Sequence, residues 1–301
     1  MARTHKLNFI NWMIKQLVEI GAVRNCHEIV NFSLCRQTID EGLALRRVME
    51  INWGMIPRRF WASIWRRRAD WSGHRISLAF MLAMLVGVAL LYYITNQLAA
   101  LIGWSAFDPK TVLDDSIPFV YWMMIPYSTL YFYYPAAAWF GIKSESMLRE
   151  NLIFHQMLII SCWIVFVIFM VLPVEIDLRG NMDIPESIFW KSQFDMMHSV
   201  DEPWNAWPSL HIVQSLLIVL VIRRWFPAKS SIQSLLHGLL WLAWITLVLS
   251  TMMVKQHFVF DVVTGIIYGS ACWIYWFKPT LDRIGGEQGD KIFSDVFDSE
   301  L

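Results

Sequence analysis

The chain carries little charge for its length. Of its 301 residues, 17% are Asp, Glu, Lys or Arg, 56% are hydrophobic, and the formal net charge is +0. An ordinary soluble domain is about a quarter charged, so this composition argues against one. Without a net positive charge there is also no reason to expect a nucleic-acid partner. The excess of apolar residues is typical of an integral membrane protein.

The sequence also has few cysteines, no visible signal peptide and no visible internal repeat. The four cysteines are Cys26, Cys35, Cys162 and Cys272. Their spacing favours neither a disulfide framework nor a metal site. Residues 1–20 lack a short apolar core followed by a small-residue cleavage site, so we expect no cleavable signal peptide. No internal repeat is visible, which disfavours a transporter built from inverted halves.

Long apolar runs fill the middle of the chain. A helix needs roughly 20 apolar residues to cross about 30 Å of hydrocarbon. The sequence predicts six such spans, at Ile76–Ala100, Ile117–Phe140, Leu152–Pro173, Leu210–Val221, Ile232–Met253 and Phe258–Phe277. The second contains Pro118, Pro126 and Pro135, so we expect kinks in it. The predicted fold is therefore all-α, a polytopic membrane helix bundle with six transmembrane helices.

Polar segments divide the chain into three parts. Residues 1–75 form a cytosolic or interfacial region, where apolar residues at helical spacing between Leu7 and Val18 predict an amphipathic helix. Residues 76–277 form the membrane domain. Residues 278–301 are an acidic cytosolic tail, for which we predict disorder.

A basic, aromatic segment, IPRRFWASIWRRRADW, precedes the first predicted span. Its arginines alternate with Trp61, Trp65 and Trp71. This pattern favours a juxtamembrane anchor with tryptophans in the interface, and the alternative is specific binding of anionic lipid.

The distribution of Lys and Arg predicts how the chain sits in the membrane. The N-terminal region is rich in Arg, and the segment RRWFPAKSS between the fourth and fifth spans holds basic residues and no acid. The loop over residues 174–207 is mostly acidic. Because basic segments stay in the cytoplasm, we predict that both termini are cytoplasmic and that this loop lies outside the cell (inner) membrane.

Two histidines open predicted helices on that outer side. His211 stands at the start of the fourth span and His257 just before the sixth. Asp261 is one turn after His257 on the same helix face, where its carboxylate could fix the tautomer of the imidazole. Ser209 is placed to cap the fourth span or to bind a phosphate, which helix N-termini favour. An ionisable pair at membrane depth is a functional-site hypothesis in itself.

Other interpretations stay open at this level. A His-x-x-x-Asp pair on a helix is common without catalysis. A permanent metal site on the two histidines would want a third ligand, for which His198, Asp195 or Glu202 are candidates, and we expect no metal. A catalytically dead membrane scaffold or a lipid-binding transporter is a different class, which the intact histidines argue against.

The same residues resemble a known family. PSLH at residues 208–211, and Ser250, His257 and Asp261 in the pattern S-x6-H-x3-D, are similar to two signatures of the type 2 phosphatidic acid phosphatase superfamily. The resemblance covers roughly residues 76–277 and implies a six-span core with an outer-leaflet site. It implies that His257 attacks phosphorus and forms a phosphohistidine, that His211 protonates the leaving group, and that Asp261 orients His257.

The departures from the family pattern concern its basic residues. Thr251 follows Ser250 where the family usually has Arg, and Lys255 is the candidate to replace that charge. Arg179, in LPVEIDLRG, matches part of the first signature, whose Lys and Pro are missing. By resemblance, Ser209, Arg179, Lys255 and Ser250 would bind phosphate. PSLH with a weak first signature is more similar to the branch of inositol phosphorylceramide synthases and related inositol-phosphotransferases.

The resemblance implies an enzyme without a cofactor, a phosphoric-ester hydrolase or phosphotransferase acting on membrane lipids. Transfer to a lipid or inositol-containing acceptor is the expectation. Plain hydrolysis of phosphatidic acid or polyprenyl diphosphate is the alternative.

Overall fold

The computed structural model describes residues 56–297, and within this range the regular secondary structure is helical, with no β-strand. The amphipathic helix predicted near the N-terminus lies outside the described residues. Four helical segments are long and apolar enough to cross a membrane, which indicates a membrane protein. They are Gly73–Ile102, Glu145–Val171, Ser231–Met253 and Val259–Ile284. They match the first, third, fifth and sixth predicted spans.

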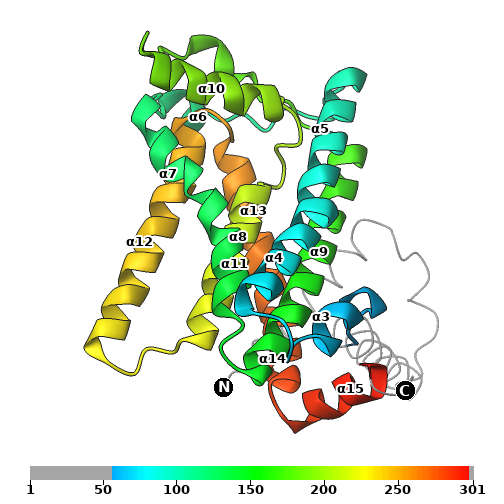
Figure 1. Cartoon of the computed structure of the whole chain (residues 1–301). Coiled ribbons are helices and arrows are strands. Elements are labelled where there is room, and N and C mark those ends of the chain that lie inside the picture. Colours follow the sequence, from blue (N-terminus) through cyan, green and yellow to red (C-terminus); the bar gives the residue numbers. More distant parts are fainter. Residues whose placement is uncertain (1–55, 298–301) are drawn as a thin grey trace, which may run out of the picture. The chain divides into compact units, whose positions relative to one another are not determined.

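These four segments comprise several elements (Figure 1). The first consists of α4 (Gly73–Met84), the π-helical turn η2 (Leu85–Ala89) and α5 (Leu90–Ile102). The next two are α9 (Glu145–Val171) and α12 (Ser231–Met253), whose N-caps Ser144 and Ser230 each accept a backbone N–H of the first turn. The last consists of α13 (Val259–Cys272), η5 (Trp273–Phe277) and α14 (Lys278–Ile284).

The other two predicted spans are interrupted or short. The second is divided into η3 (Tyr121–Met123), α7 (Met124–Ser128) and α8 (Leu130–Phe140), and Pro126 and Pro135 lie in α7 and α8. Proline removes a backbone donor and clashes with the preceding turn, so the predicted kinks are present. The fourth is α11 (Leu210–Trp225), with 16 residues. Six membrane spans therefore stay a prediction.

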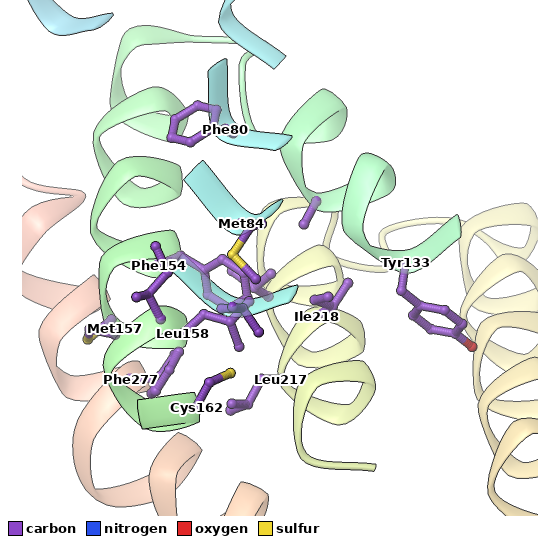
Figure 2. Close-up of a cluster of buried hydrophobic side chains, with 14 of the residues drawn as sticks. Phe80, Met84, Tyr133, Phe154, Met157, Leu158, Cys162, Leu217, Ile218 and Phe277 are labelled. Carbon is purple, nitrogen blue, oxygen red and sulfur yellow. The ribbon is translucent and has the colours of Figure 1, made fainter. Parts of the chain in front are cut away.

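The hydrophobic core is built around α9. In its most apolar stretch 72% is buried, against no more than 28% in the other three long segments. Figure 2 shows residues of this core from four elements: Phe80, Phe154, Leu217 and Phe277. Helix α11 is also enclosed, because α8, α9, α12 and α13 all pack against it. A helix surrounded by protein does not have to present a full-length lipid-facing surface, which accounts for the shortness of α11.

Short helices lie at the two ends of the bundle (Figure 1). At one end are α6 (Val112–Ser116), the turn η4 (Asp177–Asn181) and α10 (Ile188–Val200). At the opposite end are η1 (Arg59–Trp61), α3 (Ala62–Arg66), α14 and α15 (Glu287–Phe297). The N-termini of α11 and α13 point toward the end that carries α6 and α10.

The prediction of a disordered tail is wrong for residues 278–297. These residues form α14 and α15, and Phe293 and Phe297 of α15 are buried. The ring of Phe293 lies 4.5 Å from that of Trp65, and the Arg66 side chain donates to the Phe297 carbonyl. The two phenylalanines are one turn apart, so they form an apolar face on a helix whose acidic residues face outward. Overall composition hid this periodicity.

The same packing corrects the interpretation of the basic, aromatic segment. Trp61 is fully buried and Trp65 is 3% exposed, so neither ring is available to a membrane interface. Trp61 packs against Phe80 of α4, with ring centroids 5.4 Å apart, and α15 covers Trp65. These two tryptophans therefore belong to the core at this end of the bundle.

Two glycines bring α11 and α13 into close contact. A Cβ atom added to Gly265 would lie 2.9 Å from the Ser209 carbonyl oxygen, and one added to Gly269 would lie 3.5 Å from the Cα atom of Val213. The contact advances by one turn on both helices together, so the helices are parallel, as predicted. Small residues four apart permit such an approach between membrane helices. The contact sets the N-termini of α11 and α13 side by side.

This contact predicts a large effect of one added methyl group. Gly265→Ala should destabilise the protein by about 1–3 kcal/mol, because a Cβ at 2.9 Å from a backbone oxygen forces the helices apart. The separation should also lower activity about 100-fold if the two N-termini carry the reacting groups. Thermal unfolding and turnover of the purified protein measure both quantities.

Gly238→Ala is the matched control, since Gly238 is also helical and nothing lies within 4 Å of its added Cβ. It should be neutral or slightly stabilising, because alanine favours the helix over glycine. Equal behaviour of the two variants would contradict the role of this helix contact.

Candidate active site

The structure brings His211 and His257 into direct contact. The Nδ1 atom of His211 lies 3.0 Å from the Nε2 atom of His257, although the residues are 46 positions apart. His211 is in the first turn of α11, and His257 is in the turn that joins α12 to α13. His257 is 4% exposed, and His211 is partly buried. The sequence prediction that the two histidines share one site agrees with this geometry.

A tight backbone reversal holds His257 in place. The N–H groups of Gln256 and His257 both donate to the carbonyl of Thr251, at 3.0 and 3.2 Å. Lys255 takes the left-handed conformation needed to turn the chain, with φ 60°. The imidazole of His257 is therefore presented by main-chain geometry just before α13 begins.

Asp261 links the two helix N-termini. Its Oδ2 atom accepts the Phe258 N–H at 2.9 Å, and its carbonyl accepts the Ser209 N–H at 3.1 Å. The same Oδ2 lies 3.5 Å from Nδ1 of His257. Both this Nδ1 and the fully buried Oδ1 of Asp261 lack a hydrogen-bond partner among residues 56–297. Hydrogen bonds of this kind often tighten only when substrate binds.

Tyr127 contacts the other side of His211. Its hydroxyl lies 3.0 Å from Nε2 of His211, so both ring nitrogens of this histidine have a partner. Tyr127 is in α7, directly after Pro126. Sequence reasoning missed it because the segment IPYSTLYFYYP offers several tyrosines that a pattern cannot distinguish. Its place next to Pro126, at the kink, is the one signal that sets it apart.

Arg179 contacts Gln256, the residue that precedes His257 in the sequence. Its Nη2 donates to Oε1 of Gln256 at 2.7 Å, and its buried Nε has no hydrogen-bond partner in the described part of the chain. The guanidinium is within electrostatic range of Asp201 and Tyr127. Burial lowers the pKa of Arg179. It raises the pKa of Asp201, an effect that the Tyr92 hydroxyl and Arg179 oppose. A buried cation at this position can stabilise negative phosphoryl oxygens.

The other predicted phosphate ligands differ in what they contact. The Ser209 hydroxyl is fully buried, does not cap α11, and finds no partner within residues 56–297. The Ser250 hydroxyl donates to the Leu247 carbonyl of its own helix at 2.6 Å. The ammonium of Lys255 donates to the carbonyls of Asp114 and Ile117, at 3.2 and 2.6 Å. Phosphate binding by these residues stays a prediction, and Ser209 has the hydroxyl still available for it.

Asp114 is a second residue that sequence reasoning missed. Its Oδ1 accepts the Val259 N–H at 2.7 Å, so a residue of α6 caps the first turn of α13. Its Oδ2 accepts the N–H and the hydroxyl of Thr111, which fixes the carboxylate. The short-range Thr–Asp capping box is visible in the sequence, but the contact with Val259 spans 145 positions.

The candidate third metal ligands do not assemble with the two histidines. Over residues 56–297, no three His, Cys, Asp or Glu side chains gather closely enough to hold a metal ion. Burial and the nearby Arg179 lower the pKa of His198 to about 4, so this side chain is neutral at pH 7. Its Nε2 atom has no partner in the described residues, which leaves it available to a polar ligand.

Comparison with known families decides the identity of this fold. The PAP2 superfamily model matches residues 94–275, which is more than half of the chain. The chain belongs to the PAP2 superfamily. Members of this superfamily are phosphatases or phosphotransferases, and membership indicates a lipid phosphatase or phosphotransferase. No curated protein and no solved structure matched the chain.

The PAP2 match contains all of the candidate site. It runs from α5 to η5 and so includes Tyr127, Arg179, His211, His257 and Asp261. Among the elements outside it, η1, α3, α14 and α15 lie at the opposite end of the bundle, and α4 and η2 form the first part of the first long apolar segment (Figure 1). The candidate site and the helices α3 and α15 thus lie at opposite ends of this PAP2 protein.

Proposed function

We propose that this PAP2 protein is a lipid phosphotransferase, similar to the inositol-phosphotransferases, that works through a phosphohistidine intermediate at the outer membrane face. The observation that supports this most is the array of Asp261, His257 and His211 at the adjoining N-termini of α13 and α11. Each of these residue types has a defined task in phosphoryl transfer, and their order along the array fits those tasks.

The first half-reaction uses His257 as the nucleophile. The Asp261 carboxylate favours a proton on Nδ1 of His257 and leaves the lone pair on Nε2. The lipid phosphate enters between the two imidazoles, and Nε2 attacks phosphorus. As the bond to the leaving oxygen breaks, His211 gives that oxygen a proton. The Arg179 guanidinium, the Ser209 hydroxyl and the free N–H groups at the start of α11 stabilise the phosphoryl oxygens.

The second half-reaction decides the class of enzyme. His211 removes a proton from the acceptor hydroxyl, which attacks phosphorus and restores neutral His257. A lipid or inositol-containing hydroxyl makes the protein a phosphotransferase, and water makes it a phosphatase. The weak first signature and the Leu in PSLH support transfer. Membrane lipids are then both the donor and the acceptor.

The proposed orientation follows from charge. The site shares its end of the bundle with the acidic loop over residues 174–207, and the arginine-rich segment over residues 58–68, which contains α3, is at the other end. With basic segments retained in the cytoplasm, the histidines face the outside of the cell membrane and both termini face the cytoplasm.

A substrate panel tests this function. Purified protein is offered phosphatidic acid, polyprenyl diphosphate, phosphatidylglycerol phosphate, and phosphatidylinositol together with ceramide or diacylglycerol. We expect the last mixture to yield a new inositol-phosphate lipid faster than any member of the panel yields free phosphate. Free phosphate as the main product would replace transfer with hydrolysis, and no turnover of any member would favour the scaffold interpretation.

The same panel tests the orientation. In sealed right-side-out vesicles, a short-chain lipid phosphate that cannot cross the bilayer should be consumed when added outside. Consumption only after the vesicles are opened would reverse the proposed orientation.

A further inference from the structure

In the hydrogen bond between Tyr127 and His211, the neighbouring contacts of His211 and His257 determine which residue donates the proton. A neutral imidazole carries one proton, so one of its nitrogens donates and the other accepts. His211 has a partner on each nitrogen, Tyr127 at Nε2 and His257 at Nδ1, both at 3.0 Å. Once the proton on one imidazole nitrogen is assigned, the donor and acceptor of every other hydrogen bond from Asp261 to Tyr127 follow.

The assignment starts at Asp261. Its carboxylate accepts the Phe258 N–H and stands beside Nδ1 of His257, which favours the proton on that nitrogen. Nε2 of His257 is then an acceptor, so Nδ1 of His211 donates to it. Nε2 of His211 must in turn accept, and the only hydrogen that the Tyr127 contact can supply is the hydroxyl proton of Tyr127.

We propose that Tyr127 is a positioning residue that holds His211 in the proton-donating tautomer and replaces the proton that His211 gives to the leaving group. This inference rests on the proposed function. It differs from that function in assigning the acid step to a pair of residues rather than to His211 alone.

The proton and electron balance of this relay is complete. In the first half-reaction the Nε2 lone pair of His257 forms the N–P bond, and the P–O bond breaks with its electron pair on the leaving oxygen. That oxygen takes the proton from Nδ1 of His211, while the hydroxyl proton of Tyr127 moves to Nε2. In the second half-reaction the acceptor hydroxyl returns a proton to Nδ1, and Nε2 returns its proton to Tyr127. The P–N bond breaks with its electron pair on His257.

The surroundings of Tyr127 fit this role. The side chain is 4% exposed and packs with Met124, Phe194 and Val254, so its hydroxyl is fixed and bulk water is kept away. Burial and Asp201 oppose negative charge on the phenolic oxygen, and Arg179, which lies within electrostatic range, favours it. A proton relay through a tyrosine requires a positive charge near the phenolic oxygen, and Arg179 supplies it.

Dependence on the leaving group separates a relay from a structural role. Tyr127→Phe removes one oxygen and keeps the ring. We expect it to slow release of a lipid alcohol from its phosphate ester about 10- to 100-fold, because an alkoxide leaves only with a proton. With p-nitrophenyl phosphate the loss in nitrophenolate release during the first turnover should be under about threefold, since nitrophenolate leaves without one. Both rates are measured on the same sample, so their ratio does not depend on how much of the variant is folded.

The matched control is Tyr133→Phe. Tyr133 is also buried, at 7% exposed, on the neighbouring α8, and its hydroxyl has no partner in the described part of the chain. Its removal should leave both rates and their ratio unchanged.

The outcomes separate the two proposals. An equal loss on both substrates, or no loss on either, in Tyr127→Phe would overturn the relay and leave the phosphohistidine mechanism in place. Retention of activity on both substrates by His257→Ala would overturn the proposed function itself.

Discussion

Replacing His257 with glutamine should lower the turnover of every lipid phosphate by at least about 10⁴-fold, because glutamine removes the Nε2 lone pair that forms the proposed bond to phosphorus. The Nε2 atom of His257 faces His211 across 3.0 Å, and its position is held by the backbone reversal at Thr251. Glutamine is close in size and can keep a polar contact with His211, so the helix N-termini should stay together. The loss is measured as initial rate per folded molecule.

His237→Gln is the control for this substitution. His237 is on α12, and its Nε2 interacts with the Phe226 carbonyl, away from the array. This variant should keep its activity. If the His257 variant retained more than about one hundredth of wild-type turnover, an attack by water on a bound phosphate would account for the reaction better than covalent catalysis.

Asp261→Asn should reduce turnover by roughly 10²–10⁴-fold while the protein stays folded. The amide oxygen can still accept the Phe258 N–H that Oδ2 accepts at 2.9 Å, so the start of α13 is preserved. The same amide oxygen then faces Nδ1 of His257. It carries no negative charge, so it holds the proton on Nδ1 less strongly and does not stabilise the positive charge that the imidazole gains when Nε2 attacks phosphorus. The drop should appear in kcat, with KM changed little.

Asp114→Asn is the matched control for this charge removal. Asp114 also caps the first turn of α13, through the Val259 N–H at 2.7 Å, but it contacts no histidine of the array. It should cost stability, about 1 kcal/mol for a weakened cap, without a comparable fall in kcat. Equal losses of kcat in the two variants would mean that Asp261 acts by capping α13 and does not set the tautomer of His257.

The parts of the site that lie close together in the sequence were predictable. His257 and Asp261 are one turn apart, so helical periodicity alone puts them on one face. The pairing of His211 with His257 followed from the prediction that both helices begin on the same side of the membrane. Tyr127 and His211 are 84 positions apart, and a tyrosine in an aromatic run carries no periodic signal that would reveal the contact. Charge alone suggested Lys255 as a phosphate ligand, but its ammonium donates to the carbonyls of Asp114 and Ile117.

In the fold, too, local features were predictable and contacts between distant residues were not. Long apolar runs predicted four helices that match membrane spans, because their length and composition are local properties. The burial of individual side chains and the order of α15 depend instead on packing against neighbouring helices. Trp61 and Trp65 have the amphipathic rings of interfacial residues, yet the contacts with α4 and α15 bury them. Helix α15 is acidic overall, and its order depends on two phenylalanines that meet Trp65 from more than two hundred residues away.

The phosphohistidine is the central claim, and trapping it is the most direct test. Wild-type protein is mixed with a lipid phosphate labelled with ³²P in the transferred group, quenched within the first turnover, and mapped by peptide. We expect label on the peptide that contains His257, stable in base, lost in acid, and absent from His257→Gln. Label on another residue, or steady turnover with no label on the protein at any quench time, would contradict it.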